Sequence, residues 1–186
     1  MEERTGITTF RGNPVTLLGP ALRVGDRAPD FRVVDSQLAD VTQADFTGKI
    51  KIICTVPSLD TEVCATETRR FNREAEQLDD DIAVLVVSLD LPFAQSRWCS
   101  SKGVERVRIL SDHRERSLGL AYGVLIKELQ LFSRAVFVVD GGDIVRYIQQ
   151  VAEITDQPDY AAAIAAAKGL QIPMSPLPMD GICGGY

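Results

Sequence analysis

The chain has 186 residues, a formal net charge of −6 at pH 7 and 45% hydrophobic residues. This length predicts one domain that buries its own core without disulfide or metal support. The acidic balance argues against a nucleic-acid-binding surface. The sequence shows neither a long apolar run nor a basic, apolar leader, which argues against a membrane-spanning or secreted protein. We therefore expect a cytoplasmic protein.

The first half of the chain predicts a β-hairpin and a strand-helix-strand unit. The hairpin is ITTFRGNPVTLL, with its turn at Gly12-Asn13-Pro14. Residues 49–55 and 82–89 form apolar runs typical of buried strands. Between them a helical face is predicted, made of Cys64, Thr68, Phe71, Ala75 and Leu78. Strand, helix and strand in this order predict a right-handed crossover between parallel strands.

The second half of the chain adds shorter elements. LPFAQSRWC and ERSLGLAYGV predict short helices around the strand VRIL, and the strands RAVFVVD and IVRYIQQV flank a hairpin turn at residues 140–143. A last helix is predicted at residues 159–168, ending at Gly169. This order predicts an α/β protein with a thioredoxin-like fold, in which helices flank a central mixed sheet after an N-terminal β-hairpin.

The domain boundary is predicted near the end of that last helix. Residues 1–169 are expected to form a single thioredoxin-like domain. Residues 170–186, LQIPMSPLPMDGICGGY, are rich in proline and glycine. Such a composition predicts an extended tail.

The stretch VPSLDTEVC, residues 56–64, joins the first buried strand to the predicted helix. If Thr61 is the N-cap, its hydroxyl can accept a hydrogen bond from the amide of Cys64. A cysteine in the first turn is favoured as the thiolate. A helix terminus supplies only about 0.3 to 1 kcal/mol, whereas strong acidification of a thiol needs roughly 3 kcal/mol. A cation is therefore expected nearby, and Arg134, which opens the strand RAVFVVD, is the candidate.

The residues alone leave three other interpretations open. Cysteine is among the most buried residue types, so Cys64 could be an inert core residue. Arg134 could be an edge residue whose guanidinium reaches solvent. A cysteine-histidine hydrolase would have to pair Cys64 with His113, the single histidine. The loop character of SDHRERS favours a surface or capping role for that histidine.

The segment PSLDTEVC resembles the peroxidatic motif P-x-x-x-T-x-x-C of the peroxiredoxins. Across residues 8–168 the chain is similar to their thiol peroxidase subfamily in the segments RGNPVTL, DLPFAQSRWC, SDHRERSLGLAYGVLI, RAVFVVD and EITDQPDY. The resemblance implies a peroxidase that uses no metal or organic cofactor. Cys64 would attack a hydroperoxide, Thr61 would orient it, Pro57 would shield the sulfur, and Arg134 would hold the thiolate and polarise the O–O bond.

The resemblance also implies how the cycle closes. Cys99 would be the resolving thiol, condensing with the Cys64 sulfenic acid to an intrachain disulfide that prevents further oxidation. A thioredoxin-like dithiol protein would then reduce this disulfide. Because a disulfide needs Cα atoms within about 7 Å, residues 61–66 and 92–100 are expected to unwind locally. A homodimer is implied as well.

Two further cysteines, Cys54 and Cys183, are expected to play no part in the reaction. Cys54, inside an apolar strand, is expected to be a buried and inert thiol. Cys183 in the tail is expected to be passive, although it could compete with Cys99 as the resolving thiol. The alternative function on the same fold is a redox sensor or relay that passes oxidation from Cys64 to a partner protein.

Overall fold

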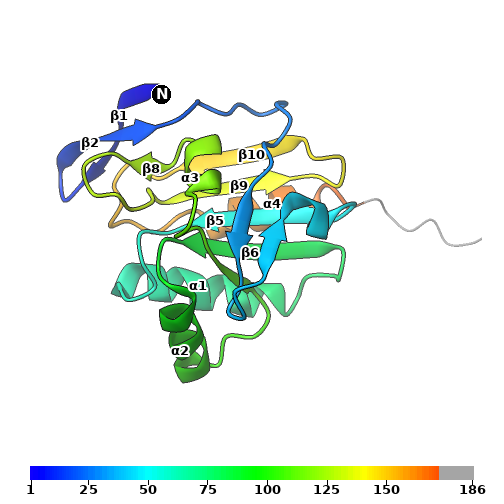
Figure 1. The fold of residues 1–186 in the computed structure, drawn as a ribbon. Coiled ribbons are helices and arrows are strands. Elements are labelled where there is room, and N and C mark those ends of the chain that lie inside the picture. Colours follow the sequence, from blue (N-terminus) through cyan, green and yellow to red (C-terminus); the bar gives the residue numbers. More distant parts are fainter. Residues whose placement is uncertain (172–186) are drawn as a thin grey trace, which may run out of the picture.

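The computed structural model describes residues 1–171, and these residues form two β-sheets with helices packed around them (Figure 1). The larger, seven-stranded sheet has the strand order β10-β9-β5-β6-β7-β3-β4. Its strands are β3 (Arg32–Val34), β4 (Asp40–Thr42), β5 (Ile50–Thr55), β6 (Ile82–Ser88), β7 (Arg108–Ser111), β9 (Ala135–Val139) and β10 (Val145–Gln150). The strands β5, β6 and β7 are parallel, whereas β9 is antiparallel to β5 and to β10. The predicted mixed sheet is confirmed.

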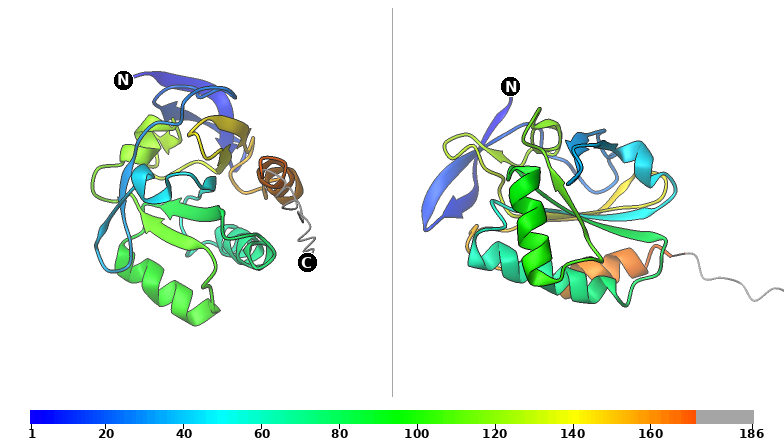
Figure 2. Two further views of the ribbon diagram at one scale, coloured as in Figure 1. Left: turned by 90° about the vertical axis from the view of Figure 1, so that its right-hand side faces the viewer. Right: turned by 60° about the horizontal axis from the view of Figure 1, so that its bottom comes forward.

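Helices cover both faces of this sheet (Figure 2). They are α1 (Glu62–Ala75), α2 (Pro92–Lys102), α3 (Ser117–Ala121), α4 (Tyr160–Lys168) and the 3-10 helix η1 (Gln43–Phe46). On one face, Cys54 of β5 packs with Phe71 of α1 and Trp98 of α2. On the other face, Ile53 packs with residues of η1 and α3. Side chains of a strand alternate between faces, so β5 lies at the centre of two hydrophobic cores.

The N-terminal hairpin is confirmed, but its predicted turn is wrong. Strands β1 (Glu3–Phe10) and β2 (Asn13–Leu18) form a second sheet with β8 (Leu125–Ile126), in the order β1-β2-β8. The turn residues are Arg11 and Gly12, both with positive φ, at 51° and 78°. Two positive φ angles suit a two-residue turn between twisted antiparallel strands. Glycine adopts positive φ readily, but arginine does so rarely, so the sequence did not indicate a turn that begins at Arg11.

Other predicted elements differ from the structure mainly at their ends. Asp159 is the N-cap of α4, because its Oδ1 accepts a hydrogen bond of 3.0 Å from the Ala162 amide. The helix therefore begins at Tyr160. The predicted tail, residues 170–186, lies outside the described residues from position 172 onward. None of the helices in residues 1–171 has the length and apolar character that crossing a membrane requires.

Candidate active site

The loop after β5 delivers Cys64 to the first turn of α1. Thr61 is the N-cap with extended backbone angles, and its Oγ1 accepts a hydrogen bond of 3.4 Å from the Cys64 amide. The Thr61 hydroxyl in turn donates to the Ser58 carbonyl at 3.0 Å. The predicted cap is therefore present. Cys64 is fully buried, whereas Thr61 is exposed at the start of the helix.

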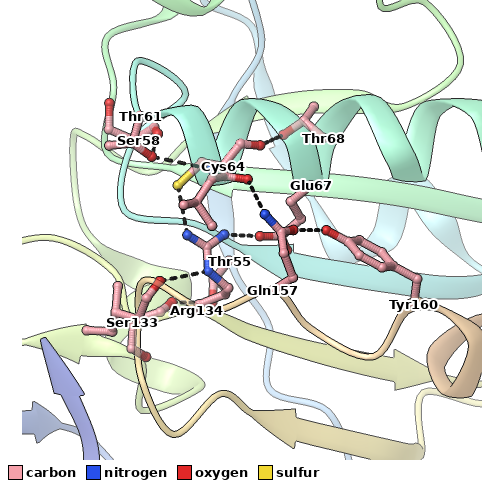
Figure 3. A network of polar contacts seen from close by, with 12 residues as sticks. Thr55, Ser58, Thr61, Cys64, Glu67, Thr68, Ser133, Arg134, Gln157 and Tyr160 are labelled. Atoms are coloured by element: carbon pink, nitrogen blue, oxygen red, sulfur yellow. Dashed lines mark hydrogen bonds and ion pairs between the residues drawn. The ribbon is translucent and has the colours of Figure 1, made fainter. Parts of the chain in front are cut away.

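Arg134 reaches Cys64 because of the way β9 pairs with β5. The two strands are antiparallel and place Ala135 opposite Thr55, so the residue before β9 lies beside the loop after β5. The Arg134 Nη2 donates to the Cys64 Sγ at 3.2 Å (Figure 3). Arg134 is only 1% exposed. The alternative in which its guanidinium reaches solvent is therefore wrong.

Two further partners fix the Arg134 guanidinium. Its Nε donates to the Ile154 carbonyl at 2.9 Å, and its Nη1 donates to the Glu67 carboxylate. Burial alone would lower the pKa of Arg134, but the interactions of its guanidinium with Glu67 and Cys64 outweigh burial and raise that pKa. The guanidinium therefore remains cationic beside the sulfur, and a fixed cation next to a cysteine in a first helical turn favours the thiolate.

Glu67 is a site residue that the sequence analysis missed. It lies one turn beyond Cys64 on α1 and is fully buried. Burial raises its carboxyl pKa to about 7, although the charge of Arg134 acts in the opposite direction. Its Oε1 has no hydrogen-bond partner within the described part of the chain. The i+3 spacing from Cys64 could have identified Glu67, because that spacing places both on one helix face.

The segment before α4 supports the same turn of α1. Gln157 Nε2 donates to the Val63 carbonyl at 3.2 Å, and the Tyr160 hydroxyl donates to Gln157 Oε1. The Tyr160 ring also packs edge-on against Phe71, with centroids 5.1 Å apart. Three segments distant in sequence therefore converge on Cys64: the loop after β5, the start of β9 and the start of α4 (Figure 3).

The structure also places the remaining predicted site residues. Pro57 is buried in the loop between β5 and α1. Cys99 lies on α2 as a half-buried free thiol, and burial raises its pKa. Cys64 is also a free thiol, on a separate helix, and it belongs to the hydrophobic cluster against which Cys99 packs. Cys54 is a fully buried free thiol on β5, and burial raises its pKa well above the ordinary value. Cys183 lies outside the described residues.

His113 does not contact Cys64. Its Nδ1 lies 2.9 Å from the Ser111 Oγ, on the loop that follows β7. The hydrogen-bonding contacts that the structure gives Cys64 come from Thr61, from Arg134 and from within its own helix. The pair that a cysteine-histidine hydrolase needs is not formed.

Comparisons with known proteins show the family of this chain. Residues 23–164 match the family described as Redoxin. A thiol peroxidase of Halalkalibacterium halodurans is 54% identical over 160 residues, which are 86% of this chain and 96% of the relative. The chain belongs to the redoxin family. A second relative, the thiol peroxidase of Bacillus subtilis, is 51% identical over 87% of this chain and 96% of its own length.

Solved structures place it with the same proteins. A peroxiredoxin-like protein from Aquifex aeolicus superposes with a TM-score of 0.83 and 42% identity, covering 92% of this chain and 100% of the other. Thiol peroxidase from Chromobacterium violaceum superposes with a TM-score of 0.77 and 25% identity, covering 87% and 95%. The predicted thioredoxin-like fold is confirmed, and this redoxin is a thiol peroxidase enzyme of the peroxiredoxin type.

Proposed function

We propose that this thiol peroxidase reduces hydrogen peroxide and organic hydroperoxides at Cys64. The observation that carries the proposal is the 3.2 Å contact from Arg134 Nη2 to Cys64 Sγ, inside the first turn of a helix. This contact provides a nucleophilic sulfur and, directly beside it, a fixed donor for a polar O–O bond.

The first step transfers one oxygen atom to sulfur. The Cys64 thiolate attacks the terminal oxygen of the hydroperoxide, so an S–O bond forms while the O–O bond breaks. Sulfur loses two electrons and becomes a sulfenic acid, which keeps the hydroperoxide proton. The other oxygen leaves as alkoxide or hydroxide and takes a proton from solvent water as it departs from the site. Arg134 stabilises the charge that develops on the oxygens, and the Thr61 hydroxyl orients the peroxide.

Pro57 shields the sulfur from water, which is consistent with its burial in the loop beside Cys64. Because the Cys64 side chain is fully buried, a hydroperoxide enters only when the residues covering the sulfur are displaced locally. Donors already held in place then meet the oxygens in a site from which water is excluded.

The second step forms a disulfide between Cys64 and Cys99. The Cys99 sulfur attacks the sulfenic sulfur, an S–S bond forms, and the hydroxyl leaves as water. The two cysteines lie on α1 and α2, so the first turn of α1 and part of α2 unwind to bring them together. Burial raises the pKa of Cys99 in the folded helix. Unwinding exposes this thiol to water and makes the nucleophilic thiolate easier to form.

A thioredoxin-like dithiol protein then reduces the disulfide by thiol-disulfide exchange, which regenerates both thiols. The need for that reductant suits a cytoplasmic location, where thiols are kept reduced. We also propose a homodimer, and a single domain that spans residues 1–169. The alternative of a redox sensor requires a partner protein to reach Cys64, and the complete burial of Cys64 disfavours it.

Steady-state turnover tests the proposal. Thioredoxin, its reductase and NADPH are mixed with cumene hydroperoxide and enzyme, and NADPH consumption is followed. We expect wild type and the C54S control to turn over, and C64S to lose activity. Turnover by C64S would contradict the assignment of Cys64. A wild type that is oxidised once and consumes no further NADPH would favour the sensor.

A further inference from the structure

Asp90 holds the loop that carries Cys64. It follows β6, and its Oδ1 accepts a hydrogen bond of 2.7 Å from the Ser58 hydroxyl. Its Oδ2 accepts from the Leu59 amide at 2.8 Å and from the Ser88 hydroxyl at 2.8 Å. Hydrogen bonds to an ionised carboxylate are stronger than those between neutral groups. One carboxylate therefore fixes Ser58 and Leu59 to the end of β6.

The hydrogen bond from Ser58 to Asp90 also connects Asp90 to the N-cap of the Cys64 helix. The Ser58 carbonyl accepts two hydrogen bonds from Thr61, at 3.1 Å from its amide and at 3.0 Å from its hydroxyl. The Thr61 oxygen then accepts from the Cys64 amide. Displacing Ser58 therefore displaces the cap and the first turn of α1.

Asp90 is equally close to the helix that carries Cys99. The next residue, Leu91, is the N-cap of α2, and its carbonyl accepts a hydrogen bond of 3.0 Å from the Gln95 amide. Gln95 is only 2% exposed. Its Nε2 donates to the Ser88 hydroxyl at 3.0 Å and to the Leu110 carbonyl at 2.9 Å. Ser88 therefore links the Asp90 carboxylate to the body of α2.

We propose that Asp90 is a positioning residue that couples the two redox segments and limits the rate of disulfide formation. Its carboxylate stabilises the folded arrangement of both segments, and it releases Ser58 and Leu59 before Cys64 and Cys99 meet. The inference rests on the proposed disulfide cycle. It adds that this one side chain sets how long the sulfenic acid persists, and hence how often a second peroxide oxidises it to sulfinic acid.

Asp90→Asn tests the coupling with little change of shape. The amide offers one acceptor oxygen, so it cannot serve the three donors from Ser58, Leu59 and Ser88. We expect disulfide formation to become about ten-fold faster, the effect of losing one charge-assisted hydrogen bond from the folded arrangement. We also expect the sulfinic acid fraction at excess hydrogen peroxide to fall several-fold.

Rapid acid quench and alkylation, followed by mass spectrometry, measure sulfenic acid, sulfinic acid and the Cys64–Cys99 disulfide against time. Asp140→Asn is the matched control, because Asp140 is also a loop carboxylate that accepts several hydrogen bonds, including two at its Oδ1 from the Gly142 and Ile144 amides of the β9–β10 hairpin. A general loss of stability would lower the melting temperature of both variants. Only loss of the Asp90 coupling shifts the partition between disulfide and sulfinic acid.

The outcomes separate this inference from the proposed function. If wild type forms the Cys64–Cys99 disulfide, and Asp90→Asn forms it at the wild-type rate or more slowly, the role of Asp90 is overturned. If wild type forms no such disulfide, the proposed cycle fails, and the inference about Asp90 fails with it. A faster disulfide in Asp90→Asn, with D140N unchanged, supports the inference.

Discussion

The Arg134 Nη2 lies 3.2 Å from the Cys64 Sγ, although 70 residues separate the two in sequence. Antiparallel pairing of β9 with β5 produces this contact, because the start of one strand meets the end of the other. Cys64 contributes a sulfur in the first turn of α1, and Arg134 contributes a buried cation held by Glu67 and the Ile154 carbonyl. The reactivity of the site depends on this one pair.

Arg134→Lys is predicted to lower kcat/KM by about 100- to 1000-fold, the effect of removing one preorganised donor. Lysine keeps the charge, but its ammonium cannot replace the planar fork that bonds Cys64, Glu67 and the Ile154 carbonyl together. Hydroperoxide-dependent turnover measures the loss. Arg146→Lys is the control, because Arg146 pairs with Asp140 and is about half exposed. An Arg134→Lys enzyme within three-fold of wild type would show that a positive charge alone suffices.

Thr61→Val is predicted to lose both a helix cap and an orienting hydroxyl. The missing N-cap bond should lower the free energy of unfolding by about 1 kcal/mol. The rate of Cys64 oxidation should fall as well, because the cap holds the Cys64 amide and the hydroxyl is proposed to orient the peroxide. Thr61→Ser keeps the hydroxyl and should retain most of both properties. Urea denaturation and stopped-flow oxidation measure the two effects, and a Thr61→Val protein oxidised at the wild-type rate would exclude a role for the hydroxyl.

The raised pKa of Glu67 predicts that the free energy of unfolding of the protein changes with pH. Its folded pKa of about 7 lies above the ordinary value of 4.5 because of burial. The neutral acid is therefore favoured in the folded protein. The contribution of Glu67 to the free energy of unfolding is fully present below pH 4.5 and is lost as pH rises through 7. The loss amounts to roughly 3 kcal/mol.

Glu67→Gln removes this titration. Relative to wild type, the free energy of unfolding of the variant should increase by roughly 3 kcal/mol between pH 4.5 and pH 7.5. Urea denaturation at several pH values gives both curves under identical conditions. Parallel curves for the two proteins would mean that Glu67 does not titrate in this range.

Cys54 is predicted to resist alkylation in the native protein. It is fully buried in the central strand β5, so the alkylating reagent cannot reach its sulfur. Burial also raises its pKa, so the reactive thiolate does not form at neutral pH. Iodoacetamide should label Cys54 only as fast as the protein unfolds, whereas the half-buried Cys99 should react sooner. Labelling of Cys54 ahead of Cys99 would contradict its assignment as an inert core thiol.

Much of the fold followed from local patterns. The near-continuous apolar runs around β5 and β6 predicted central strands, and the Thr61 cap was predicted from residue type and position. The location of Arg134 was proposed, but its burial depends on a strand pairing that no local pattern encodes. Glu67 was missed because a charged residue on a helix is ordinarily exposed, and only its partner Arg134 explains its burial. The turn at Arg11 was missed because arginine rarely adopts positive φ.

The central claim is that Cys64 is oxidised by hydroperoxide and resolved by Cys99. Its most direct test treats fully reduced protein with one equivalent of cumene hydroperoxide and maps the disulfides by peptide mass spectrometry. We expect a dominant Cys64–Cys99 link, with Cys54 and Cys183 left as thiols. A Cys64–Cys183 link, or a persistent sulfenic acid with no disulfide, would contradict it.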